Sequence, residues 1–266
     1  MIWQGVHGYP AALALPMHGA GLDVRRAQFA HADGERGLLI AQTLVAAKIV
    51  SMRGLVRRRA EIDGRGCLGA LATLAKRARQ AKSIDTLLGL EGSATALYFS
   101  TWPHMLADRA EDIEFETRSR RPPRNAINAM LSYAYAVLSS ECLCALAATG
   151  LDPKLGVLHQ PRAGRAALML DLMEPFRPLI ADQAVLGGLN TGQLKATEAD
   201  ESVDGWRLGE GGKRTVLALI EKRMMAAITL DGSETPVCYR DLIGQQAQSI
   251  AKSLKTGADF RALERP

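Results

Sequence analysis

The chain has 266 residues, and 47% of them are hydrophobic, which is enough to fill the core of one large domain or two modest ones. Lys and Arg number 33 against 28 Asp and Glu, so the net charge of +5 favours an anionic partner without identifying one. The N-terminus lacks a charged region followed by an apolar stretch and a cleavage site, and no unbroken apolar run reaches the ~18 residues of a membrane span. The sequence therefore predicts a globular cytoplasmic protein and no membrane partner.

The four cysteines support the same cellular location. They follow neither a C-x-x-C spacing nor a Cys/His spacing that would bind zinc. We expect all four to be reduced core residues, as is usual in the cytoplasm. They are Cys67, Cys142, Cys144 and Cys238.

The first part of the chain changes from a loop-like to a helical pattern. Residues 1–24 are rich in Gly, Pro and Ala and predict at most a short strand or two. From Glu35 to about Arg59 the apolar residues recur at spacings of three and four with basic residues between them, which predicts an amphipathic helix with a positive flank. The helical pattern returns over 68–82 and over 83–110, where Ser83 is suited to begin a helix.

Two prolines divide the chain near its middle. Pro122 lacks an amide donor and Pro123 disfavours helix at the residue before it, so we expect a basic loop there. Asn125 can cap a long helix that ends at Gly150. Residues 190–212 lack a clear pattern and are expected to be irregular, and the sequence predicts further helices near 211–228 and 239–256.

Basic residues cluster four times in the first half of the chain. Each cluster by itself is typical of a solvated helix face, but four of them favour a polyanionic partner. The clusters are Arg25 and Arg26; Arg53, Arg57, Arg58 and Arg59; Lys76, Arg77, Arg79 and Lys82; and Arg118, Arg120, Arg121 and Arg124.

One stretch, "GVLHQPRAGRAALMLDLMEPFRP" at 156–178, raises the question of a metal site. If its second half is helical, Asp171 and Glu174 share a face, and two carboxylates placed together require a cation or a proton to offset their repulsion. An acidic pair near a helix start also complements the helix dipole, and His159 could precede it by chance. The residues alone leave both interpretations open.

The ordered set of motifs resembles one known family, the CRISPR-associated adaptation integrase Cas1. The resemblance covers most of the chain and rests on "LDVRRAQF", "LLIAQTLVAAKIVSMRGLVRR", "LLGLEGSATALYF", "RSRRPPRNAINAMLSYAYAVLSSECLCALAATGLDPKLGVLH", "LMLDLMEPFRPLIAD" and "CYRDLIGQQAQSIAKSL". Each motif is weak by itself, whereas their order and spacing together are specific.

The resemblance implies a mainly α fold and a metal site. A helical catalytic domain is expected over 25–266, and 1–24 would be a short remnant of the β-rich N-terminal domain of the family. Glu91, His159 and Glu174 match the family's catalytic metal ligands, and Asp171 is a supporting residue or an alternative ligand. Two carboxylates and an imidazole suit Mn²⁺ or Mg²⁺.

The resemblance also implies an activity and partners. The family is a metal-dependent DNA endonuclease and integrase that joins a spacer DNA 3′-hydroxyl to the repeat array by transesterification. The implied partners are double-stranded and branched DNA, the Cas2 protein and a second copy of the chain. Because only a short N-terminal segment precedes the helical domain, we expect dimerisation to be weak. Two alternatives remain at this stage: a transposon-type integrase of the same family, and a catalytically idle DNA-binding scaffold.

The resemblance to the Cas1 family also suggests roles for several further residues. The candidates for DNA phosphate contacts are Arg57, Arg58, Arg121, Arg124, Arg162 and Arg165. The remaining aromatic and imidazole candidates are expected to pack in the core, and these are His104, Tyr133 and Tyr135.

Overall fold

The structure is a computed structural model that describes residues 2–4, 10–13, 20–60, 63–107, 115–119, 121–230 and 234–265. Helices dominate the described part of the chain, which confirms the predicted mainly α class. The helices are α1 Ala20–His31, α2 Glu35–Arg59, α3 Leu68–Ala78, α4 Ile84–Ser100, α5 Ala126–Thr149, α6 Ala167–Met173, α7 Gln183–Asn190, α8 Glu210–Met224 and α9 Tyr239–Thr256.

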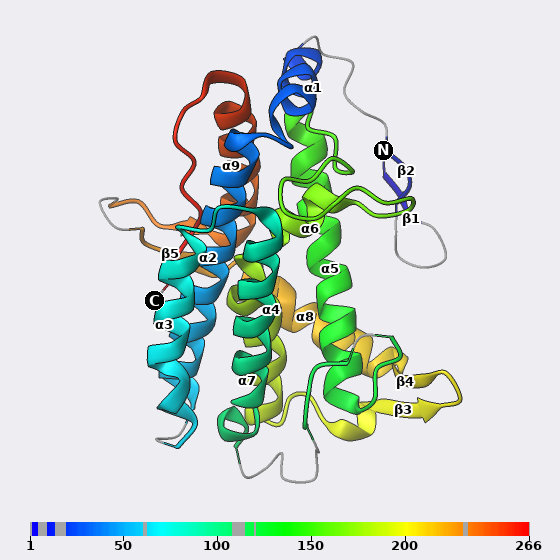
Figure 1. The fold of residues 1–266 in the computed structure, drawn as a ribbon. Coiled ribbons are helices and arrows are strands. Elements are labelled where there is room, and N and C mark those ends of the chain that lie inside the picture. Colours follow the sequence, from blue (N-terminus) through cyan, green and yellow to red (C-terminus); the bar gives the residue numbers. More distant parts are fainter. Residues whose placement is uncertain are drawn as a thin grey trace.

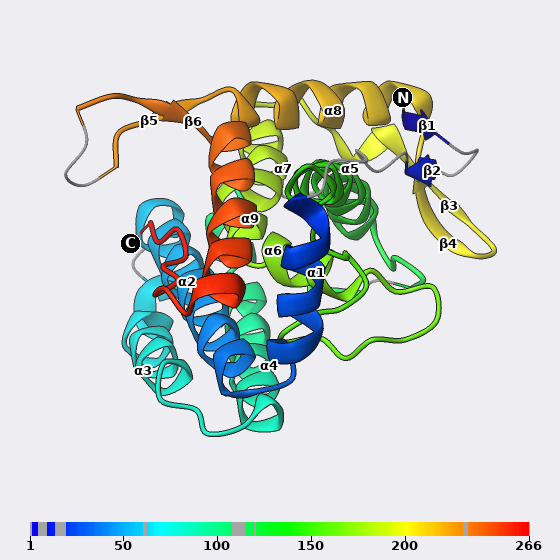
Figure 2. The same ribbon diagram turned by 90° about the horizontal axis from the view of Figure 1, so that it is seen from above.

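Among the described residues, short strands form three antiparallel pairs beside the helices. They pair β1 Ile2–Gln4 with β2 Pro10–Leu13, β3 Ala199–Ser202 with β4 Gly205–Leu208, and β5 Ala227–Ile228 with β6 Val237–Cys238. The last two extend away from the helices (Figure 2). The first one agrees with the short strands expected near the N-terminus.

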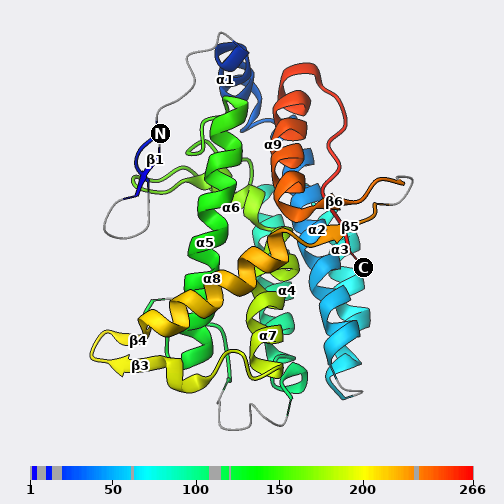
Figure 3. The same cartoon turned by 180° about the vertical axis from the view of Figure 1, so that it is seen from behind.

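The long helices surround a central segment. Helix α2 lies beside α3 and α4, and α5 stands on the other side of the molecule (Figure 1). Helix α9 contacts both α2 and α5 and is flanked by α1 (Figure 2), and α8 crosses α5 obliquely (Figure 3). Between α2 and α5 run α6 and the π-helix η4 Arg177–Asp182.

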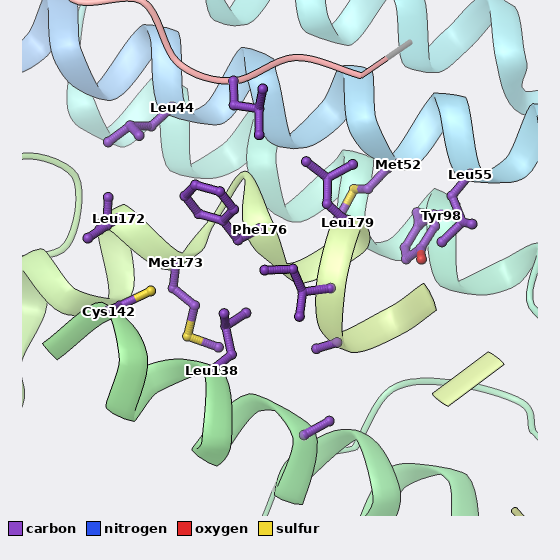
Figure 4. Close-up of a cluster of buried hydrophobic side chains, with 14 of the residues drawn as sticks. Leu44, Met52, Leu55, Tyr98, Leu138, Cys142, Leu172, Met173, Phe176 and Leu179 are labelled. Carbon is purple, nitrogen blue, oxygen red and sulfur yellow. The ribbon is translucent and has the colours of Figure 1, made fainter. Parts of the chain in front are cut away.

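The main hydrophobic core forms on both faces of this central segment (Figure 4). Phe176 and Leu179 lie towards α2, whereas Met173 faces α5. All three are at most 2% exposed. Such close packing on two sides holds the α6–η4 backbone in one position relative to α2 and α5.

Capping residues begin and end the helices where the sequence predicted. The Ser83 hydroxyl accepts a hydrogen bond from the Thr86 amide at 3.2 Å, and the Asn125 side chain accepts one from the Asn128 amide at 2.8 Å. Gly150 ends α5 with φ of 79°. A Cβ atom there would lie 2.6 Å from the Cα of Gly21, so this position requires glycine for both its conformation and its contact with α1.

Three segments differ from the expectation. The helix predicted over 83–110 ends at Ser100, because Pro103 begins a separate 3-10 turn after it. Residues 190–212 contain the β3–β4 hairpin, whose turn depends on Gly205 with φ of 98°. Helix α1 begins at Ala20, within the segment predicted to be a remnant of the N-terminal domain.

Some residues predicted to lie in the core are outside it. His104 is exposed, because the 3-10 turn directs Trp102 and Met105 inward instead. All four cysteines are free, but Cys142 alone among them is buried, and Cys144 is exposed. Tyr133 and Tyr135 pack against the core as predicted.

Two helices, α2 and α5, are long and apolar enough to cross a membrane by length and composition, once a few charged residues are tolerated. Of the 18-residue apolar stretch in each helix, 72% is buried inside the protein in α2 and 44% in α5. Core helices have the same composition, so this is weak evidence for a membrane span.

A buried carboxylate connects α4, α5 and η4. Asp182 is 0% exposed and accepts hydrogen bonds from the hydroxyls of Tyr98 at 2.9 Å and Tyr135 at 2.7 Å. Burial raises the pKa of Asp182 to about 6, although the two tyrosine hydrogen bonds and the charges of Lys48 and Arg118 oppose that shift.

We expect Leu138→Ala to lower the free energy of unfolding by about 2–5 kcal/mol, since it leaves a cavity between α5 and α6. Leu217→Ala on α8 is the matched control, because this leucine is 44% exposed and its loss should cost less than about 0.5 kcal/mol. Urea unfolding of both variants measures the difference. Equal losses in the two variants would contradict the described packing.

The raised pKa of Asp182 predicts a pH-dependent stability. The folded state binds this proton more tightly than the unfolded state, so the contribution is full below the ordinary pKa of 3.8 and is lost as pH rises through about 6. The total is about 3 kcal/mol at about 1.4 kcal/mol per pKa unit. Asp182→Asn lacks this titration, so its unfolding free energy should gain about that amount relative to wild type between about pH 4 and pH 7. A constant difference in urea unfolding over this range would contradict the assignment.

Candidate active site

A buried lysine joins two of the predicted site residues. The ammonium of Lys48, on α2, is bonded to Glu91 Oε1 on α4 and lies 2.5 Å from Glu174 Oε2 at the end of α6. The Lys48 side chain is 2% exposed, that of Glu174 1% and that of Glu91 18%. Two carboxylates from distant parts of the sequence therefore converge on one cation.

Helix α2 places this lysine inside the protein. Lys48 lies among the apolar residues Leu44, Val45, Ile49 and Met52, all of which are buried. A buried ammonium costs several kcal/mol of lost hydration unless it is paired. The carboxylates of Glu91 and Glu174 supply that pairing.

Glu174 carries its negative charge in the interior. Burial by itself raises the pKa of this carboxyl, but the charges of Arg177 and Lys48, with a smaller electrostatic contribution from His159, outweigh burial and hold the pKa at about 2. Arg177 Nη2 lies 3.2 Å from Glu174 Oε1. The other oxygen, Oε2, is buried without a hydrogen bond of good geometry, although Lys48 is adjacent.

Asp171 organises the loop that carries His159. Its Oδ2 accepts hydrogen bonds from the amides of Val157 at 2.7 Å and Leu158 at 3.0 Å, and its Oδ1 accepts one from the His159 amide at 3.0 Å. The same Oδ1 lies 2.6 Å from His159 Nδ1. Gly156 permits this clamp, because a Cβ atom there would lie 2.7 Å from Asp171 Oδ2.

The clamp determines which ring nitrogen of His159 is available. A carboxylate only accepts hydrogen bonds, so Nδ1 carries the proton that it shares with Asp171. The unshared electron pair then lies on Nε2, as is usual for a histidine that binds a metal ion. Asp171 is fully buried, and it supports His159 through these bonds.

The side chains of the candidate site match the ligand types of a divalent metal ion, although they do not form a closed ligand group. Within the described ranges, no three His, Cys, Asp or Glu side chains are arranged as a group that could hold a metal. Glu91 and Glu174 nevertheless meet at one position, where the Lys48 ammonium takes the place that a cation would take. Their carboxylate oxygens are the type of ligand that a hard divalent ion prefers, and Glu174 Oε2 is buried without a hydrogen bond of good geometry. The metal role of Glu91, His159 and Glu174 stays a prediction.

The predicted DNA-contacting arginines lie at three surface locations. Arg57 and Arg58 are exposed at the end of α2, and Arg121 and Arg124 are exposed before α5. On the loop after His159, Arg162 is exposed and Arg165 half-buried, and the Arg165 amide donates to the Arg162 carbonyl at 3.0 Å.

Sequence reasoning missed two basic residues near the site, Lys48 and Arg177, and identified Arg118 only as a member of a basic cluster. The burial of Lys48 could have been predicted from the sequence, since it is the one charged residue between Thr43 and Met52 in an otherwise mostly apolar stretch. Arg118 and Arg177 both stack on the ring of Tyr135, each at 5.3 Å from its centroid. With Arg121 they line a cavity of about 250 Å³ that also contains the hydroxyl-bearing Ser132 and Ser139.

Comparison with curated proteins identifies two informative relatives. The chain is 39% identical over 231 residues to a CRISPR-associated exonuclease Cas4/endonuclease Cas1 fusion of Geobacter sulfurreducens, covering 84% of this chain and 41% of that protein. It is 36% identical over 250 residues to a CRISPR-associated endonuclease Cas1 of Thermus thermophilus, covering 94% of this chain and 73% of that protein. The chain thus spans less than half of the fusion protein.

Three solved structures share the fold. A CAS1 protein from Thermotoga maritima has a TM-score of 0.78 at 27% identity, over 97% of this chain and 76% of that one. A partial Cas6-RT-Cas1–Cas2 complex has a TM-score of 0.80 at 26% identity, over 97% and 78%. A casposase bound to an integration product has a TM-score of 0.81 at 22% identity, over 98% and 76%, which shows similarity of fold alone.

The sequence profile of one family matches most of the chain. That family is described as CRISPR associated protein Cas1, and the match covers residues 1–222. Together with relatives above 30% identity, this match establishes what the motifs suggested: the chain belongs to the Cas1 family.

Proposed function

We propose that the chain is a metal-dependent DNA endonuclease and integrase that joins spacer DNA to a CRISPR repeat array. The observation that carries this proposal is the convergence of Glu91 and Glu174 on one buried cation position. Membership of the Cas1 family supports the same activity. An idle DNA-binding scaffold would have no need to maintain two carboxylates around a buried charge at a cost in hydration.

Glu91, Glu174 and His159 would hold a Mg²⁺ or Mn²⁺ ion. When bound, such an ion supplies Lewis-acid activation of a phosphodiester and stabilises negative charge on the attacking and leaving oxygens. Glu174 is ionised at neutral pH and is therefore ready to act as a ligand. Asp171 keeps a proton of His159 on Nδ1, so that in the neutral imidazole Nε2 carries the electron pair that would bind the metal.

The reaction exchanges one phosphodiester bond for another. A 3′-hydroxyl of the spacer loses its proton and attacks a backbone phosphorus, and the 3′-oxygen of the cleaved strand leaves and takes up a proton. No nucleoside triphosphate is needed, because the number of phosphodiester bonds is unchanged. With water as the nucleophile, the same residues would nick DNA.

Basic side chains would bind the DNA backbone around this site. Arg118, Arg121 and Arg177 line one cavity, and Arg177 also contacts Glu174; their guanidinium groups match phosphate oxygens. The exposed arginines at the end of α2 and on the His159 loop would add salt-sensitive contacts without sequence preference. Double-stranded and branched DNA is the proposed substrate.

Cas2 and a second copy of this chain are the proposed protein partners. The similar solved structures include a partial Cas6-RT-Cas1–Cas2 complex. The casposase shares only the fold with this chain, so transposon ends are the alternative substrate. A plasmid bearing repeats and a plasmid bearing transposon ends, offered to the same protein with a labelled duplex, distinguish the two.

We expect His159→Ala to abolish Mn²⁺-supported nicking and joining while changing the Kd for DNA by less than about threefold, because DNA affinity comes from many phosphate contacts. His104→Ala is the matched control, since His104 is exposed in a 3-10 turn. Gel assays of product and of binding provide both measurements. Full strand transfer by the His159 variant would place the chemistry elsewhere.

We expect Asp171→Asn to slow nicking at least about tenfold and to lower the free energy of unfolding by about 3 kcal/mol, because an amide nitrogen would face backbone donors that now meet a carboxylate oxygen. Asp204→Asn removes a carboxylate whose side chain is 79% exposed and serves as the control. Urea unfolding and the nicking rate at saturating DNA measure these effects. An Asp171 variant with wild-type stability and rate would show that the clamp is dispensable.

A further inference from the structure

The Lys48 ammonium lies between the two carboxylates that a metal ion at this site would also contact. This ammonium contacts one oxygen of Glu91 and lies 2.5 Å from one oxygen of Glu174. No other described residue bridges these two carboxylates. We propose that Lys48 is a built-in competitor of the divalent cation, which holds the two carboxylates together before the metal binds and lowers their affinity for it. This inference rests on the proposed metal-dependent function.

The local charges support competition over simple structural pairing. Glu91 and Glu174 carry two negative charges, and Lys48 and Arg177 carry two positive charges, so the cluster is neutral without a metal. A divalent ion placed between the carboxylates would meet the Lys48 ammonium at close range, and like charges repel strongly where water is excluded. Binding therefore requires the ammonium to give up its position beside Glu174.

Burial explains why the lysine is present at all. Without Lys48 the two carboxylates would face each other with Arg177 contacting Glu174 alone, and such a pair is unstable in the interior. The lysine supplies the missing cation from within the chain. The metal-free protein can then fold with its ligands already close together, and the metal exchanges for a charge that the fold provides.

The test measures binding of Mn²⁺ alone, in the absence of DNA. The electron paramagnetic resonance signal of free Mn²⁺ gives the Kd for wild type, Lys48→Met and Lys76→Met. Lys76 is exposed on α3, so its substitution removes the same charge from the molecule at a distance from the site. We expect Lys48→Met to bind Mn²⁺ at least about tenfold more tightly, and Lys76→Met to match wild type within about twofold.

Lys48→Arg provides a second comparison because it keeps the positive charge. Its Kd for Mn²⁺ should stay within about threefold of wild type. Equal or weaker Mn²⁺ binding by Lys48→Met, with the variant folded by circular dichroism, would overturn the proposal. Equal tightening in Lys76→Met would overturn it too, since net charge would then explain the change.

Thermal melts keep the proposal testable if Lys48→Met folds poorly without metal. Mn²⁺ should then raise its Tm by more degrees than it raises that of wild type, because the ion replaces the missing cation. Failure of Mn²⁺ to raise the Tm of this variant would refute competition. Absence of Mn²⁺ binding in wild type and Lys48→Met alike would refute the metal-dependent function itself, and binding with equal affinity would refute only the role of Lys48.

Discussion

The buried charge of Lys48 ties together α2, α4 and the end of α6. A lysine in the middle of the buried face of α2 can be accommodated only if carboxylates reach it, and these come from α4 and from the end of α6. Satisfying this one charge therefore fixes the positions of three elements relative to one another. The same requirement brings Glu91 and Glu174 together, so the pairing that makes the core possible also assembles the candidate site.

The α6–η4 segment transmits this constraint to the other half of the molecule. Phe176 and Leu179 pack towards α2, and Met173 packs towards α5, while Arg177 and Asp182 carry charge into the same region. The π-helical turn over Arg177–Asp182 widens the helix where Pro178 cannot donate a hydrogen bond. Apolar packing and paired charges alternate along this short segment, and neither would be positioned without the other.

The candidate site separates two tasks between two acidic residues that lie one helical turn apart. Glu174 pairs with Lys48 and Arg177, and one of its oxygens lacks a well-formed hydrogen bond. Both oxygens of Asp171 instead accept hydrogen bonds from the loop that carries His159. One carboxylate thus pairs with cationic side chains, and the other holds the His159 loop in place. This division is consistent with the Cas1 family membership and with the proposed DNA integration, because a phosphoryl transfer site needs ligands whose positions are settled before DNA binds.

The local features of this protein can be predicted from its amino-acid sequence. The periodicity of α2, the Asn125 and Ser83 caps, and the Gly150 helix end follow from residues within one or two turns, and the ordered motifs identified the Cas1 family. The burial of Lys48, the hydrogen bonds of Asp171 to three amides and an imidazole ring, and the exposure of His104 follow from how the helices pack together. Those outcomes depend on which distant groups satisfy a buried charge, and helical spacing, which repeats every few residues, carries no information about partners contributed by other helices.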